Sequence, residues 1–325
     1  MTIEAKIIAD SVSPYGPRIT TFQLKYPRFI HAEFMTHRMF SRNASSSRAI
    51  PVEKQIDMIR EDTAMPSHWG KNQSGMQAEL ESSDSVTIPE TICTTEGKEI
   101  FPKEYTNEAA WCEARDRAIE VARGFVKAGY HKQIVNRILE PFSHISVVCT
   151  ATNYENFFWL RRHKDAQPEI KILADKMFDV MTNSMPVKLS EYDWHLPYIT
   201  DDERDGIEVV NLGDGNIGEQ ALFTTDELIK MSVARCARVS YLTHDGQTPD
   251  YKKDLALYER LVGSSPLHAS PAEHQATPDY VVAGEHVYMW MNPHLHGNLN
   301  GYKQYRKMLA GENQSMWKGL NDFGA

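Results

Sequence analysis

The sequence predicts a soluble globular protein that contains both β-strands and α-helices. Hydrophobic residues make up 41% of the 325 residues and charged residues 24%, close to the average for folded domains. A chain of this length can bury most of its unfolded surface, in one large domain or two modest ones. Segments rich in β-branched and aromatic residues occur among segments with apolar residues at helical spacing, so strands and helices are both expected.

Two strands and several helices are predicted from local patterns. Residues 18–26 carry β-branched and aromatic side chains and stop at Pro27, and residues 143–152 form a second, apolar strand. The clearest helix is 107–129, with Gly129 as its C-terminal stop. The other predicted helices cover residues 29–38, 51–62, 153–163, 168–185, 225–237 and 250–262.

Other stretches are predicted to lack regular structure. Residues 41–48 are polar and rich in serine, which is typical of a functional loop. Periodicity fades over residues 65–106, so we expect an insertion or lid with little secondary structure of its own. Residues 213–218 match the dinucleotide pattern GxGxxG, but the cap-like residues 224–226 place the next helix too late, which favours a turn.

Composition restricts the partners and the compartment. The net charge of −9, from 35 Lys and Arg against 44 Asp and Glu, argues against binding of a nucleic acid polymer. No apolar run approaches the roughly 20 residues that cross a bilayer, and the first residues lack a secretion signal, so no membrane partner and a cytoplasmic location are expected (host cytoplasm if the source is viral).

Cysteine and histidine spacing predicts no metal site. The four cysteines form no CxxC pair, which excludes zinc-ribbon and thioredoxin spacings and favours a reduced environment. Cys149 lies in an apolar run and is expected to be a buried thiol and not a nucleophile. His294 and His296 are expected at the surface or at the edge of a pocket, because no acidic or sulfur partner has metal-ligand spacing.

Residues 37–48, HRMFSRNASSSR, are the strongest candidate for a functional segment. They contain three arginines, one histidine, four serines and one asparagine at the end of an apolar stretch. Guanidinium groups offer a fixed fork of donors, and serine hydroxyls can complete an anion site, so this composition suits a phosphate. A solvated basic turn is the alternative that composition leaves open.

The order of residues in this segment is similar to the signature of flavin-dependent thymidylate synthases, RHRxxSxNxxSxR, with Thr36 in place of the first arginine. Residues 136–141, NRILEP, resemble the ARxxLP segment of that family. Residues 156–170 resemble its NFxxLR…AQxEI segment.

Two further segments resemble the same family but stand in a different order. Residues 235–240 and 268–274 look like the RxARVS and HxTPFEH segments, which in the family precede the arginine-serine signature. Here they follow it. The resemblance therefore implies a phage-type, circularly permuted member in which residues 226–310 correspond to the N-terminal part of the family.

The resemblance also implies a fold and a reaction. Family members belong to the α/β class, of the α+β type, with a mixed sheet flanked by helices, so residues 1–325 are expected to form one domain that assembles as a homotetramer with shared active sites. The implied reaction is C5 methylation of dUMP to dTMP. The implied cofactors and co-substrates are FAD, NADPH and methylenetetrahydrofolate.

Roles carry over from the family to matching positions of this chain. Ser46, Ser47, Arg48 and Arg137 would bind the nucleotide. Arg161 would lie at the pyrimidine ring and stabilise negative charge as the reaction develops it. The residues implied to contact FAD are His37, Arg38, Asn156, Ser240, His268, Ser270 and Glu273.

Four departures from the family pattern bear on the flavin. Thr36, Ala44, Thr150 and Thr152 replace residues that are charged or carry an amide in typical members, which implies weaker FAD binding or a changed substrate. Arg306, with Gln304, is spaced like the polar residues that precede the family signature. Two alternatives therefore stay open: a dCMP or dUMP methylase or hydroxymethylase that makes modified DNA precursors, and a non-catalytic pyrimidine nucleotide-binding protein.

Overall fold

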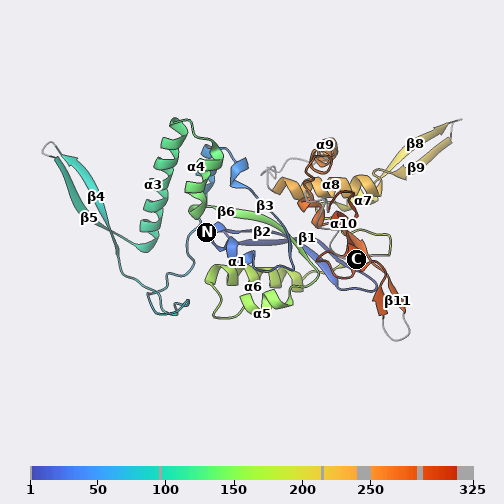
Figure 1. The fold of residues 1–325 in the computed structure, drawn as a ribbon, viewed down its shortest axis with the longest axis horizontal. Coiled ribbons are helices and arrows are strands. Elements are labelled where there is room, and N and C mark those ends of the chain that lie inside the picture. Colours follow the sequence, from blue (N-terminus) through green and yellow to red (C-terminus); the bar gives the residue numbers. More distant parts are fainter. Residues whose placement is uncertain (1, 95–96, 214–215, 240–249, 284–287, 313–325) are drawn as a thin grey trace, which may run out of the picture.

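A five-stranded mixed sheet forms the centre of the molecule (Figure 1). The computed structural model describes residues 2–94, 97–213, 216–239, 250–283 and 288–312. The strands, in spatial order, are β3 (Ser41–Ala44), β6 (His144–Ala151), β2 (Arg18–Pro27), β1 (Glu4–Val12) and β7 (Val187–Lys188). Neighbouring strands are antiparallel except β1 and β7, which are parallel. The predicted α/β class with a mixed sheet flanked by helices is confirmed.

Helices on one side of the sheet complete its main hydrophobic core (Figure 1). These are α1 (His31–Phe34), α5 (Glu155–Arg161) and α6 (Pro168–Thr182). Pro168 stands in the first turn of α6, where its missing N–H is not needed, and the Gln167 side chain caps the helix by accepting from the amide of Ile170. The core side chains from these helices and from the sheet include Phe22, Leu24, Phe34, Val147, Phe157, Leu173 and Met177.

Two further helical groups have cores of their own. The first comprises α2 (Val52–Glu61), α3 (Asn107–Lys127) and α4 (Lys132–Leu139), and buries Ile59, Ile119 and Leu139. The second contains α8 (Thr225–Arg238) and α9 (Tyr251–Val262). The C-terminal half also contains short helices and paired strands: α7 (Asp201–Asp205), α10 (Tyr305–Met308), β10 (Ala276–Pro278), β11 (Val281–Ala283), β12 (Tyr288–Trp290) and β13 (Tyr302–Gln304).

Most predicted elements are found within a few residues of their expected ends. The strands at 18–26 and 143–152 are β2 and β6, and the helices at 107–129 and 168–185 are α3 and α6. Gly129 has the expected positive φ, 85°. Within the GxGxxG stretch, Gly213 ends β8 (Ile207–Gly213) and residues 216–218 begin β9 (Asn216–Ala221), which pairs with β8 in an antiparallel sense. Helix α8 begins only after its cap at Thr224, so the prediction that no helix starts within the glycine motif is confirmed, whereas residues 214 and 215 lie outside the described residues.

Other local predictions were wrong. Part of 65–106 forms a two-stranded hairpin, β4 (Val86–Thr94) and β5 (Gly97–Tyr105), which projects away from the sheet (Figure 1). The helix expected over 29–38 is limited to one 3-10 turn and the four-residue α1. The functional loop expected at 41–48 begins with edge strand β3. The first strand, β1, has Glu, Lys and Asp in its run and was not anticipated.

Further predictions concern membrane crossing, thiols and histidines. Within the described ranges, no helix has both the length and the apolar character that a bilayer crossing requires. Cys149 is fully buried, and burial raises the pKa of its thiol to about 12, so the prediction of an inert thiol is confirmed. His294 is exposed as expected, but His296 is buried and its Nε2 lies 2.8 Å from Asp279 Oδ2, so the surface position predicted for His296 was wrong.

Candidate functional site

Buried and exposed side chains alternate along the arginine-serine segment, which comprises β3 and the turn that follows it. Four residues face the interior, namely Ser41, Asn43, Ser45 and Ser47, whereas Arg42, Ala44, Ser46 and Arg48 lie at intermediate or full exposure. This is the period of two expected for an extended strand, with polar side chains on the inner side. Buried polar groups need partners, and distant parts of the chain supply them. The amide of Asn43, for example, donates to the Cys236 carbonyl over 2.7 Å.

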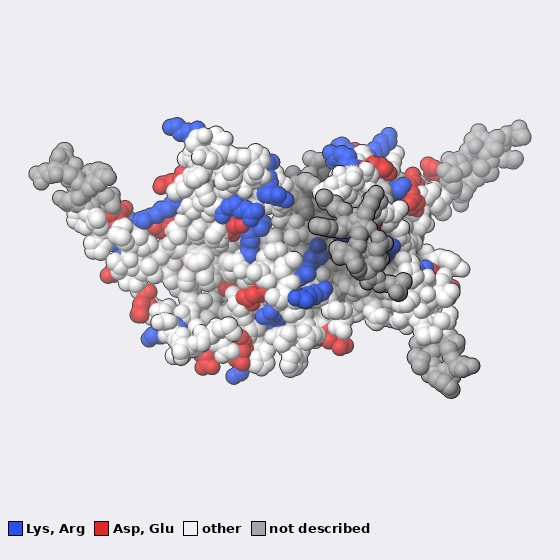
Figure 2. Space-filling model, in the orientation of Figure 1, with Lys and Arg blue, Asp and Glu red and all other residues white. Residues whose placement is uncertain are grey.

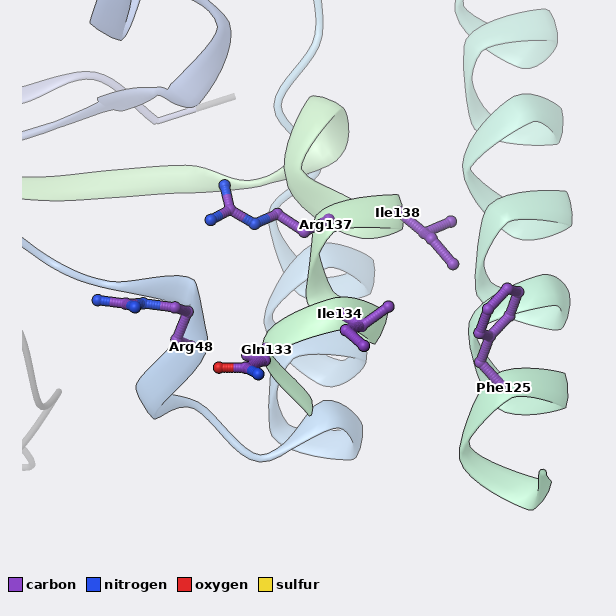
Figure 3. A pocket seen from close by; sticks show the side chains of 6 residues that line it. All are labelled: Arg48, Phe125, Gln133, Ile134, Arg137 and Ile138. Atoms are coloured by element: carbon purple, nitrogen blue, oxygen red, sulfur yellow. The ribbon is translucent and has the colours of Figure 1, made fainter. Parts of the chain in front are cut away.

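Arg48 and Arg137 line one open cavity of about 540 Å³. Figure 3 shows both side chains extending to the same side, while Phe125, Ile134 and Ile138 form the apolar side of the cavity. Arg48 comes from the 3-10 turn η2 (Ser47–Ala49) and Arg137 from α4, which pack against each other. In Figure 2, Lys and Arg side chains gather in the middle of the view, where Figure 1 places α4 and β3. The structure therefore brings together two of the four predicted nucleotide-binding residues as a pair of cations.

Ser47, the third of these residues, is already held by two groups from the end of α4. Its hydroxyl donates to Glu140 Oε1 over 2.6 Å, and its carbonyl accepts from the Asn136 side chain over 2.7 Å. Glu140 also lies 3.6 Å from Arg137 Nη1 and 3.7 Å from Arg28 Nη1. The fourth residue, Ser46, is half-buried and precedes η2. We shall call Arg28, Arg48, Arg137, Ser46 and Ser47 the anion cradle.

His37 and Arg161 form a second cluster, between α1 and α5. Arg161 Nε donates to His37 Nε2 over 3.0 Å, and Arg161 also reaches Glu33 at 3.5 Å and Thr36 at 3.4 Å. Partial burial, together with the positive charges of Arg161 and Arg42, lowers the pKa of His37 to about 4. His37 is therefore neutral near pH 7, and because its Nε2 accepts a hydrogen bond, its proton resides on Nδ1.

The two clusters do not meet within one chain. In the described parts of the molecule, Arg161 is bonded to His37, Thr36 and Glu33, and it does not line the cavity of Arg48 and Arg137. Two predicted flavin residues are exposed and belong to the same elements as His37 and Arg161. Arg38 follows His37 and precedes β3, and Asn156 lies on α5. Trp159, on the same helix, is 76% exposed, although Phe157 is fully packed. Phe157 therefore belongs to the core, whereas Trp159 faces solvent.

The C-terminal segment lies directly against β3. The 3-10 turn η5 (Ser270–Glu273) packs on β3, and Gln304 Nε2 donates to Ser41 Oγ over 3.2 Å and to the Glu273 carbonyl over 3.0 Å. Asn298 accepts from Ser41 Oγ at 3.0 Å. The segments that resemble the N-terminal part of the family are therefore next to the signature in space, although they follow it in sequence.

Other predicted flavin residues lie on or next to this turn. His268 and Ser270 are exposed, and the Glu273 carboxylate is paired with Arg306. Ser240 lies outside the described residues. Arg306 is thus the counter-ion of Glu273, a predicted site residue. Its Nε also donates to Glu312 Oε1 over 2.9 Å.

Thr150, one of the departures from the family pattern, belongs to a buried chain of hydrogen bonds and not to an exposed site. The chain runs from Ser11 to His195 (3.0 Å), to Thr21 (2.7 Å), to Thr150 (2.7 Å) and to His274 Nδ1 (2.8 Å). All five residues are at most 5% exposed. Each hydroxyl has one proton to donate, so all the hydrogen bonds in this series run in the same direction from donor to acceptor. Both histidines then carry their proton on the same ring nitrogen and so adopt the same tautomer. The Thr150 hydroxyl is thus occupied by its neighbours.

Lowering the pH below about 6.5 is expected to destabilise the fold through His195 and His274. Burial lowers the pKa of both from 6.5 to about 3. Between these values the unfolded chain binds protons that the folded chain does not, so stability is lost as the pH falls, by up to about 1.4 kcal/mol per pH unit for each histidine. Urea unfolding measured at several pH values checks the slope. The exposed-site control His294→Gln should keep the wild-type slope, whereas a wild-type stability independent of pH in this range would contradict the assignment.

No group of three or more His, Cys, Asp or Glu side chains suited to a metal ion occurs in the portion of the chain that the structure describes. Sequence reasoning also missed Arg28 of the cradle and two residues that shape it, Asn136 and Glu140. For the latter two the signal was present, since these are the two positions at which NRILEP departs from the ARxxLP pattern. Their role became visible only through their contacts with Ser47.

Comparison with known proteins gives one family match and several distant structural similarities. A family model described as thymidylate synthase complementing protein matches residues 13–187, a little more than half of the chain. The UMP/dUMP methylase PolB from Streptomyces cacaoi, bound with 5-Br dUMP, shares 15% identity at a TM-score of 0.39, over 56% of this chain and 90% of its own. The flavin-dependent thymidylate synthase ThyX from Helicobacter pylori, complexed with FAD and dUMP, shares 16% identity at a TM-score of 0.34, over 50% of this chain and 67% of its own. Comparison with curated proteins gave no match.

Proposed function

The chain belongs to the family of thymidylate synthase complementing proteins, and from this membership we propose that it is a flavin-dependent methyltransferase that converts dUMP to dTMP. The observation that carries the proposal is that Arg48, from the family signature, and Arg137 line one cavity and extend to the same side of it. Two guanidinium groups with adjacent serine hydroxyls suit a phosphate monoester. An apolar side formed by Ile134, Ile138 and Phe125 completes a cavity of the size that small ligands occupy.

The proposed roles follow from charge and accessibility. Arg48 and Arg137, with Ser46 and Ser47, bind the phosphate. Arg161 stabilises the negative charge that the pyrimidine carbonyls acquire when C5 is made nucleophilic or when C6 accepts a hydride. His37 holds Arg161 in place through Nε2, which leaves its Nδ1–H as a donor for a ligand. Ser46 serves as a positioning hydroxyl, since no described neighbour is placed as a general base for it.

The exposed polar groups around β3 and η5 fit a flavin in part. Arg38, Asn156, His268 and Ser270 present accessible cationic, amide, imidazole and hydroxyl groups, the chemistry that a diphosphate and an isoalloxazine ring require. Thr150 does not fit, because its hydroxyl is used inside the buried chain. FAD would supply the hydride chemistry, and the protein would bind and orient the reactants. NADPH and methylenetetrahydrofolate are the proposed reductant and one-carbon donor.

Assembly and chain order are part of the same proposal. Because the Arg161 cluster and the anion cradle are separate within one chain, we propose a homotetramer in which different copies complete each site. Residues 226–310 would correspond to the N-terminal part of other family members in permuted order, as the contacts of Asn43 with Cys236 and of Gln304 with Ser41 support. The hairpin within residues 65–106 would be an insertion.

Incubation with dUMP, methylenetetrahydrofolate, FAD and NADPH tests the proposal. We expect dTMP, identified by mass, and flavin absorbance in the protein after FAD is added. A mass gain only on dCMP, or a hydroxymethyl product, would support the precursor-modifying enzyme instead. Binding of dUMP without binding of FAD at any concentration would support the non-catalytic nucleotide-binding protein, the outcome that the buried Thr150 hydroxyl favours.

A further inference from the structure

Glu140 places a carboxylate inside the anion cradle. It stands at the C-terminal end of α4, and its side chain is 22% exposed. One oxygen, Oε1, accepts from Ser47 Oγ at 2.6 Å and lies 3.7 Å from Arg28 Nη1. The other, Oε2, lies 3.6 Å from Arg137 Nη1. Glu140 thus takes the hydroxyl donor of Ser47 and lies within ion-pair distance of two guanidinium groups that a bound phosphate would need.

Arg28 explains why a carboxylate is stable at this place. Its side chain is 18% exposed, and burial lowers the pKa of its guanidinium, although the negative charge of Glu140 opposes that effect. The Nε of Arg28 is buried and has no hydrogen-bond partner within the described residues. A largely buried cation of this kind is stabilised by a nearby anion. Either Glu140 or a ligand phosphate can serve as that anion.

The backbone of Ser47 is held beside Glu140 by a residue of the same helix. Asn136 precedes Glu140 by one helical turn and donates to the carbonyls of Ser47 and Ile50 at 2.7 and 2.9 Å. The hydroxyl of Ser47 has a single proton, so it cannot donate to Glu140 and to a phosphate at the same time. A phosphate that takes this donor must displace the carboxylate.

We propose that Glu140 is a specificity-determining residue of the cradle: an internal anion that competes with the ligand phosphate for Ser47, Arg28 and Arg137. The inference rests on the proposed function, because it assumes that the cradle binds a nucleotide phosphate. The three arginines and the Glu140 carboxylate together carry a net charge of +2, which disfavours ligands with more negative charge, such as nucleoside di- and triphosphates. Glu140 thereby makes the cradle selective for a monophosphate.

Calorimetric binding of inorganic phosphate, dUMP, dUDP and deoxyuridine to Glu140→Gln tests the proposal. Glutamine keeps the shape and an acceptor for Ser47 but removes the charge. We expect phosphate and dUMP to bind at least about tenfold more tightly than to the wild type, dUDP to gain more than dUMP, and deoxyuridine to change less than about twofold. Glu120→Gln, on the exposed face of α3, changes the net charge equally and should leave all four affinities unchanged.

A second variant guards against loss of folding. Glu140→Asp keeps a counter-ion for Arg28 but draws the carboxylate back from Ser47, so phosphate should bind with intermediate affinity. Equal or weaker phosphate binding in both variants overturns the proposal, even if dUMP is methylated as proposed. Tighter phosphate binding in both variants, with no binding of any pyrimidine nucleotide, supports the role of Glu140 and refutes the proposed function.

Discussion

Arg48→Ala is expected to weaken dUMP binding by about 10- to 100-fold, since a charge-assisted hydrogen bond contributes about 1.5–3 kcal/mol. Arg48 is exposed and forms no ion pair with any residue that the structure describes, so its guanidinium is available for a ligand. For the same reason its loss should change the free energy of unfolding by no more than about 0.5 kcal/mol. Titration of dUMP, combined with urea unfolding, measures both quantities.

Two variants control this experiment. Arg48→Lys keeps the positive charge but loses the planar fork, so its affinity should fall between those of the wild type and Arg48→Ala. Arg260→Ala removes an exposed arginine from α9, far from the cradle in sequence, and should bind dUMP as the wild type does. Wild-type affinity in Arg48→Ala would show that the phosphate binds elsewhere.

Asp254→Ala is expected to cost about 3–5 kcal/mol of stability, because it removes one partner of a buried ion network. Asp254 is fully buried on α9 and contacts Arg235 Nε at 2.9 Å and Arg238 Nη2 at 2.8 Å. Arg235 is 4% exposed and is also held by Glu203 at 2.6 Å. Burial raises the pKa of Asp254, and the two arginines counteract the effect. Without the carboxylate, two arginines on α8 would lose a charged partner in a poorly solvated place.

Chemical denaturation and thermal melting measure the effect. The control is Asp226→Ala, which removes the partner of Lys230 at the exposed end of α8, and it should cost at most about 1 kcal/mol. Asp254→Asn keeps the shape and should remain strongly destabilised, because the missing charge and not the missing volume matters. Similar small effects of Asp254→Ala and Asp226→Ala would refute the importance of this network.

The long periodic elements could be predicted from the sequence because their determinants are local. The 107–129 helix has its cap, its apolar face and its terminal glycine within one segment, and strand 143–152 is apolar enough to be buried on both faces. The β4–β5 hairpin was missed because Pro89 and Pro102 weaken the strand pattern. These prolines stand opposite each other in a ribbon whose strands each have a free edge, where a missing N–H is tolerated.

The sequence predicted which residues belong to the candidate site, but it did not predict which of them are buried and bonded to other parts of the chain. Family resemblance identified Arg48 and Arg137, which are brought together by the packing of η2 on α4. No local pattern could show that Ser41, Asn43 and Ser47 face inward, because a polar side chain is expected outside unless a partner is known. Those partners are Asn298, Cys236 and Glu140, which are distant in sequence.

The attachment of the C-terminal segment to β3 has a consequence for the order of events during synthesis on the ribosome. Ser41 meets Gln304 across 263 positions of sequence, and Asn43 meets Cys236 across 193. The signature segment therefore leaves the ribosome long before its polar groups can be satisfied. Contacts of such separation form late and slow folding, since a long loop must close before they contribute. Until Cys236 and Gln304 have been synthesised, the nascent chain carries β3 without the partners of its inward-facing polar groups. An incompletely covered strand of this kind is prone to aggregation, so we expect chaperones to bind at this stage.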